Sequence, residues 1–125
     1  MIKKILFICI IFSVSVSAQS TDRIYFAFAD EALAVSSAAV NFTQATIEPA
    51  SSAFRAELAV FRVECASTSP CPVRLRYEGT DATAALGYEL DEGDSRSLTG
   101  WENIDNASFI RSGSNDAVID VIFHR

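Results

Sequence analysis

Residues 61–65 read Phe-Arg-Val-Glu-Cys, so that apolar and charged side chains alternate along the chain. The same period of two recurs in residues 54–58, 73–77 and 119–123. This period is typical of β-strands that bury one face and expose the other to water. The alternation slips by one residue at Val60-Phe61, which predicts either a β-bulge or a strand that crosses between two sheets.

Short turn signals, rich in glycine and small polar residues, separate these runs at residues 78–81, 91–94, 99–100 and 112–116. Strands joined by such turns at intervals of about 8–12 residues are typical of a sandwich or a small barrel. We therefore expect a single all-β domain, a small antiparallel β-sandwich with a jelly-roll or Ig-like outline.

The N-terminal part of this domain predicts three more strands, at residues 23–28, 33–40 and 42–47. The stretch 30–40 is rich in alanine and also fits a helix. Its β-branched residues and serines, together with the strands around it, favour a strand.

The first 18 residues have the parts of a secretory signal peptide. Lys3 and Lys4 precede an apolar run at residues 5–12, and small residues occupy the two positions expected before a cleavage site at Gln19. The apolar run is too short to span a bilayer, which takes roughly 20 residues as helix. The alternative is a buried N-terminal strand. We expect cleavage to leave residues 19–125 as a secreted or periplasmic domain, with no stable membrane insertion.

Residues 19–125 are acidic and contain no lysine, because both lysines lie in the leader. Eight arginines against 16 carboxylates give this part a net charge of −8. Such a balance argues against nucleic acid as a partner, which requires a basic patch. The arginines alternate with apolar residues along the predicted strands, which indicates either a solvated face or a face that docks a neighbouring subunit.

Two cysteines, Cys65 and Cys71, remain after removal of the leader, and Pro70 and Pro72 flank the second one. An even cysteine count in an exported domain predicts a disulfide, here pinning a hairpin between the flanking strands. Its short ring limits the stabilisation to about 2 kcal/mol. A metal half-site or a redox pair is disfavoured, because the chain has no second cysteine pair and redox motifs use a two-residue spacer.

The densest group of carboxylates, Glu89, Asp91, Glu92 and Asp94, surrounds Gly93 in one predicted turn. Carboxylate oxygens are the ligands that calcium prefers, so this turn is a candidate calcium site. Its spacing does not match an EF-hand loop, and a solvated hairpin turn with Gly93 at positive φ is the alternative. No other metal and no cofactor is expected.

Candidate catalytic residues are sparse. A Ser-His-Asp relay needs a histidine oriented in a cleft, and His124, the one histidine, stands next to the last residue of the chain. Glycosidases need two facing carboxylates, and nothing in the spacing of the acidic residues favours such a pair. We therefore expect that the protein is not an enzyme.

Trp101, directly after Gly100, is the candidate for contact with a ligand or an assembly partner. Together with Tyr25, Tyr77 and Tyr88 it could form a platform on which sugars stack. The alternative is ordinary packing, and the alternation at residues 73–77 places Tyr77 in the core.

The order of strands and turns over roughly residues 54–123 resembles small β-rich structural proteins of tailed phages and prophages. The resemblance rests on four stretches: residues 73–83, a charged strand leading into Glu-Gly-Thr-Asp-Ala-Thr; residues 87–94, Gly-Tyr-Glu-Leu-Asp-Glu-Gly-Asp; residues 108–113, Ser-Phe-Ile-Arg-Ser-Gly; and the strand at 116–121. The leader and the cysteine pair depart from that pattern.

This resemblance implies a non-enzymatic, oligomeric sandwich module of the virion. We accordingly expect an exported structural or interaction module that assembles with itself or decorates a virion or cell surface. The alternative is a secreted module that binds carbohydrate or calcium.

Overall fold

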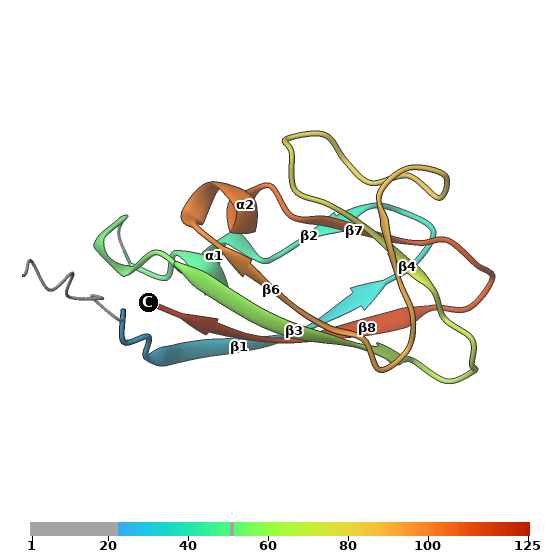
Figure 1. Ribbon diagram of the computed structural model, residues 1–125, viewed down its shortest axis with the longest axis horizontal. Coiled ribbons are helices and arrows are strands. Elements are labelled where there is room, and N and C mark those ends of the chain that lie inside the picture. Colours follow the sequence, from blue (N-terminus) through green and yellow to red (C-terminus); the bar gives the residue numbers. More distant parts are fainter. Residues whose placement is uncertain (1–22, 51) are drawn as a thin grey trace, which may run out of the picture.

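The computed structural model describes residues 23–50 and 52–125, which form two four-stranded antiparallel sheets (Figure 1). The first sheet has the order β1 (Ala27–Val35), β8 (Ala117–His124), β3 (Leu58–Cys65) and β6 (Ser95–Thr99). The second has the order β2 (Val40–Asn41), β7 (Ser108–Arg111), β4 (Val73–Arg76) and β5 (Tyr88–Leu90). The predicted all-β class is confirmed, whereas the predicted leader, residues 1–18, lies outside the described residues.

Three short helical segments complete the fold: α1 (Gln44–Ile47), the 3-10 helix η1 (Ser52–Phe54) and α2 (Trp101–Asp105). They lie in the connections between strands of the two sheets. None of the helices in the described ranges is long and apolar enough to cross a membrane.

The strand pairing follows one rule along the chain. The first strand pairs with the eighth, the second with the seventh, the third with the sixth and the fourth with the fifth. The chain is therefore one long hairpin that has been wrapped around itself, with successive pairs in alternate sheets. The pairings of β3 with β8 and of β4 with β7 then join two pairs into each sheet.

Phenylalanine rings fill the space between the sheets. Phe61 on β3 meets Phe109 on β7 edge to face, with ring centres 5.5 Å apart. Phe42, which follows β2, contacts Phe109 at 5.1 Å and Phe123 on β8 at 5.0 Å. Since burial of one such side chain contributes about 1.5–3 kcal/mol, these rings are a main source of cohesion between the two sheets.

The alternation at residues 61–65 and 119–123 is confirmed, but the predicted bulge at Val60-Phe61 is wrong. The pairing of β3 with β8 and β6 runs in continuous register, and its buried residues are Ala59, Phe61 and Val63. The slip arises because residues 54–57 are not part of this strand: there Ala56 is buried and donates its N–H to the Ile47 carbonyl. The register shift of the first sheet lies instead in β1, between Ala27 and Ala29.

The strand predicted at residues 42–47 is also wrong, because Gln44–Ile47 form a helical turn. The Glu31 carboxylate accepts hydrogen bonds from both the backbone N–H and the hydroxyl of Thr43, which holds the start of this turn. Ile47 anchors it in the core. Residues 30–35 are strand and not helix, as expected. The two strands predicted at residues 23–28 and 33–40 are wrong as separate elements, because the chain forms one strand, β1, from Ala27 to Val35.

Cys65 and Cys71 are joined in a disulfide with their Cα atoms 5.4 Å apart, as predicted. The bond does not pin a hairpin, however, because β3 belongs to the first sheet and β4 to the second. Cys71 is fully buried two residues before β4. The disulfide therefore ties the two sheets together at one end of the molecule.

We predict that Phe61→Ala lowers the free energy of unfolding by about 3–5 kcal/mol, because it leaves a cavity between the sheets. Val60→Ala is the matched control, since Val60 points outward from the same strand and is 41% exposed. Denaturant unfolding measures both variants. Equal losses would contradict the continuous register of β3.

Reduction of the disulfide should lower the free energy of unfolding by about 2 kcal/mol, and Tm by roughly 10 °C, without abolishing the fold. Thermal melts followed by circular dichroism, with and without reductant, measure the shift. A Cys65→Ser/Cys71→Ser variant should melt at the lower temperature in both buffers. A wild-type melt that reductant leaves unchanged would rule out the bond.

Candidate functional site

A cleft opens at the end of the molecule where β6 and β8 finish and β3 begins. Its volume is about 560 Å³. We call it the basic cleft; its lining residues come from four separate segments and are Arg23, Ala53, Phe54, Arg55, Glu57, Thr99, Gly100, Trp101 and Arg125.

Backbone hydrogen bonds hold the three strand ends around the cleft. The Glu57 N–H donates to the His124 carbonyl and the Gly100 N–H to the Glu57 carbonyl, both at 2.8 Å. Gly100 has φ of 91°, a conformation that side chains disfavour, and this lets the chain turn from β6 directly into α2. Trp101 is therefore presented at a fixed position.

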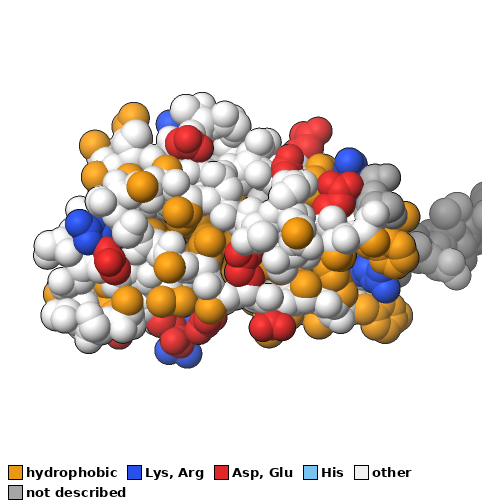
Figure 2. Space-filling view, turned by 180° about the vertical axis from the view of Figure 1, so that it is seen from behind, with side chains coloured by type: hydrophobic (Ala, Val, Ile, Leu, Met, Phe, Trp, Pro, Cys, Tyr) orange, Lys and Arg blue, Asp and Glu red, His pale blue; other side chains and the backbone are white. Residues whose placement is uncertain are grey.

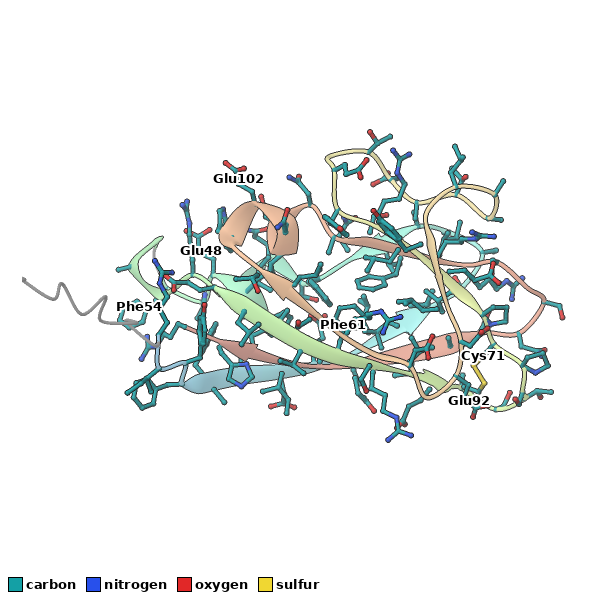
Figure 3. All side chains as sticks on the ribbon, in the orientation of Figure 1. Glu48, Phe54, Phe61, Cys71, Glu92 and Glu102 are labelled. Atoms are coloured by element: carbon teal, nitrogen blue, oxygen red, sulfur yellow. A yellow bond between two sulfur atoms is a disulfide. The ribbon has the colours of Figure 1, made fainter. Side chains whose placement is uncertain are left out.

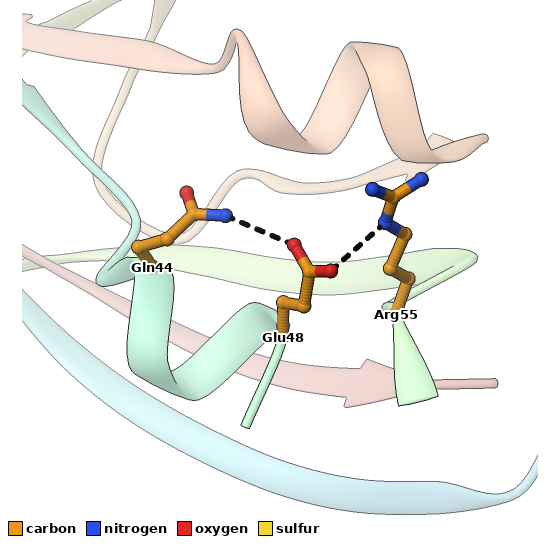
Figure 4. Close-up of polar contacts among 3 residues, drawn as sticks. All are labelled: Gln44, Glu48 and Arg55. Atoms are coloured by element: carbon orange, nitrogen blue, oxygen red, sulfur yellow. Dashed lines mark hydrogen bonds and ion pairs between the residues drawn. The ribbon is translucent and has the colours of Figure 1, made fainter. Parts of the chain in front are cut away.

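Arg55 is held between a carboxylate and an indole ring. Its Nε donates to Glu48 at 3.2 Å, and the other oxygen of Glu48 accepts from the Gln44 side chain at 3.3 Å (Figure 4). On the cleft side, the guanidinium carbon lies 4.7 Å from the centre of the Trp101 ring. This distance is within the range of a cation–π interaction, so Arg55 and Trp101 form one ordered unit.

Two further arginines add positive charge to the basic cleft. The Arg125 guanidinium lies 4.6 Å from the Phe54 ring and 5.8 Å from the Phe28 ring. Arg23 pairs with Glu57 at 3.5 Å, an exposed pair that contributes little stability. Three of the eight arginines thus meet at a cleft whose lining contains one carboxylate. On a chain with an excess of carboxylates, this is a local concentration of arginine, and among the described residues Arg125 is the one of the three that makes no ion pair.

Exposed apolar side chains border the basic cleft. Ile24 and Phe26 are 76% and 67% exposed, and Phe26 pairs through its backbone with Arg125. Phe54 is 41% exposed within the lining itself. Seen from behind, hydrophobic and basic side chains lie side by side at the right-hand end of the molecule (Figure 2). Aromatic residues and arginine are the side chains enriched in protein–protein interfaces.

The structure places Trp101 at the start of α2, half-buried and packed against the core. The sequence placed this residue in a turn and missed the helix. Trp101 and the buried Ile104 are three residues apart, the spacing of one helical face, but two positions are too few to identify a helix from the sequence.

Tyr77 and Tyr88 do not join Trp101 in a single platform. Tyr77 and Tyr88 stack on each other with ring centres 5.8 Å apart and line a separate groove of about 310 Å³ beside β5 and β6. This groove shares no residue with the basic cleft. Tyr77, expected in the core, packs against it but is only half-buried. Hydrogen bonding to Tyr88 raises the pKa of Tyr77, and the charge of Glu78 adds to the rise.

Three of the four carboxylates predicted to bind calcium have separate partners. Glu89 pairs with Arg74 at 2.6 Å, the hydroxyl of Ser69 donates to Glu92 at 2.7 Å, and Asp94 accepts from the backbone N–H of Asp91. Gly93 has φ of 86°, as a tight hairpin turn requires. Within residues 23–50 and 52–125, no group of three or more His, Cys, Asp or Glu side chains is placed to hold a metal ion. The calcium site remains a prediction from the sequence.

His124 ends β8 and is half-buried. Its Nδ1 atom is buried and has no hydrogen-bond partner among the described residues. A Ser-His-Asp relay orients its imidazole through that nitrogen. The described surroundings of His124 therefore lack the contact that such a relay uses.

No protein-family model, curated protein or solved structure matches the chain in a comparison with each of these sets. Function is therefore inferred from the molecular surface.

We predict that one tyrosine, Tyr77, ionises above the usual tyrosine pKa of about 10. A raised pKa means that the folded state favours the neutral phenol. Tyr77 therefore leaves the free energy of unfolding unchanged well below pH 10 and lowers it as pH rises beyond 10. Ultraviolet titration of Tyr88→Phe should show Tyr77 ionising at lower pH than in the wild type. Tyr25→Phe is the control, and an equal effect of both variants would contradict the assignment.

Proposed function

We propose that the protein is an exported, non-enzymatic interaction module whose basic cleft binds another protein surface. In this role it assembles with copies of itself or decorates a cell surface or a virion. The observation that carries the proposal is the meeting of Trp101, three arginines and exposed apolar side chains at one end of the molecule. Tryptophan and arginine dominate the binding energy of many protein interfaces.

The strand pairing supports a jelly-roll assignment. A long hairpin whose strand pairs alternate between two sheets agrees better with the connectivity of a jelly roll than with that of an immunoglobulin domain, and this favours the jelly-roll alternative. Jelly rolls build viral capsid proteins and lectins, which bind other molecules without catalysis. The fold by itself does not establish a function, but it agrees with the resemblance to virion structural proteins.

Export is supported by two independent features. Residues 1–18 have the pattern of a secretory signal, and Cys65 and Cys71 are at disulfide-bonding distance. Structural disulfides persist in oxidising compartments such as the periplasm and the extracellular space.

A carbohydrate-binding module is the second candidate, and the stacked tyrosines favour it. Tyr88 is 57% exposed beside the groove it shares with Tyr77. Aromatic faces of this kind stack on sugars. Binding on a glycan array that Tyr88→Ala removes would support this candidate, while an array without signal would remove it.

Site-specific photo-crosslinking tests the interaction module. The full chain, expressed with its leader, carries photoreactive benzoylphenylalanine in place of Phe54 at the basic cleft. The control carries it in place of Leu86, which is more exposed and lines no part of the cleft. We expect protein adducts from position 54 only, in the periplasmic or secreted fraction, with mass spectrometry naming the adduct. Equal adduct yields from both positions, or none from position 54, would contradict the proposal.

A further inference from the structure

We infer that the basic cleft of one copy receives the acidic turn of a second copy, so that molecules associate head to tail. The acidic turn is residues 91–94, with the carboxylates of Asp91, Glu92 and Asp94 around Gly93. The inference rests on the proposed function, because it names the partner of the cleft described there.

The basic cleft and the acidic turn lie at opposite ends of the molecule. Strand β6 starts directly after Asp94 and ends one residue before Gly100 in the cleft. Strand β3 runs from the cleft to Cys65 at the other end, a span of about 24 Å for eight extended residues. Figure 3 shows Phe54 at one end and Glu92 with Cys71 at the other. One copy therefore cannot place its own acidic turn in its own cleft.

The acidic turn presents negative charge that no arginine neutralises directly. Among the ion pairs of the described residues, none includes Asp91, Glu92 or Asp94. Arg62 lies beside Gly93, but it is paired with Glu64 at 4.0 Å. The hydrogen bond from Ser69 and the internal bond between Asp94 and Asp91 fix the shape of the turn without cancelling its charge.

The basic cleft presents the complementary charge. Arg125 has aromatic neighbours and makes no ion pair within the described part of the chain. Arg23 is paired with Glu57, but the pair is exposed and weak, so its guanidinium group can bind a carboxylate of a second copy instead. Guanidinium groups bind carboxylates through two parallel hydrogen bonds, which suits the tip of an acidic turn. Ile24, Phe26 and Phe54 supply the apolar surface that such a contact buries.

A contact between two different surfaces of the same chain has a distinctive consequence. A pair of copies bound in this way keeps one free cleft and one free turn, so assembly continues into a ring or a filament. Because the whole chain is acidic, copies repel each other at long range, and the attraction is local to the two surfaces. The association should therefore weaken as salt screens the arginine–carboxylate pairs.

Two neutralised variants separate this arrangement from other assemblies. Arg23→Gln/Arg125→Gln disables the cleft, and Asp91→Asn/Glu92→Gln disables the turn. All four side chains are exposed, so circular dichroism should show an unchanged fold. The matched controls are Arg76→Gln and Asp81→Asn, which remove the same kinds of charge outside both surfaces.

Sedimentation velocity at low ionic strength provides the readout. For the wild type and both controls we expect a mass that rises with concentration and returns to that of a monomer in high salt. Each neutralised variant alone should stay monomeric. An equimolar mixture of the two should reach twice the monomer mass and stop, because it contains a single functional pair of surfaces.

Three outcomes would overturn the inference: a monomeric wild type at all concentrations, a neutralised variant that still assembles alone, or a mixture that stays monomeric. Assembly of the turn variant alone would indicate a symmetric contact between two clefts. Photo-crosslinks from position 54 to a different protein would leave the proposed function standing while rejecting a second copy as the partner. Absence of any crosslink at that position would reject both.

Discussion

Packing of phenylalanine rings between the two sheets is the constraint on which the rest of the structure depends. Phe61, Phe109 and Phe123 come from three different strands, and Phe42 follows a fourth. The contacts of Phe61 with Phe109 and of Phe42 with Phe123 join the two sheets, so neither sheet buries its apolar face without the other. The disulfide supports the same closure at one end by linking the end of β3 to the segment before β4.

The wrapped hairpin also creates the difference between the two ends of the molecule. Strand β3 lies between β6 and β8 and is antiparallel to both. The segment before β3 therefore meets the segments that follow β6 and β8 at one end of the sheet. These segments carry Arg55, Trp101 and Arg125. The connection between β5 and β6 lies at the opposite end and carries the acidic turn. Opposite charges at the two ends thus follow from topology.

The central strands could be predicted because their pattern is local and strong. Residues 61–65 and 119–123 bury every second side chain, as their alternation indicates. The helical turns at Gln44–Ile47 and Trp101–Asp105 were not predictable in the same way. Each is about one turn long and buries one anchor, Ile47 or Ile104, which is too few positions to distinguish a helical period from a period of two.

The sequence by itself determined the all-β class, the main turns and the pairing of Cys65 with Cys71. The first two depend on residues close together in the chain, and the third on there being one cysteine pair in residues 19–125. Only the tertiary structure decided which strands pair, and hence that Arg23, Arg55 and Arg125 meet at Trp101. Strand partners and register are selected by burial of one face against the other sheet. The free energy of this burial comes from contacts between segments that are distant in the chain, so a local sequence pattern does not reveal it.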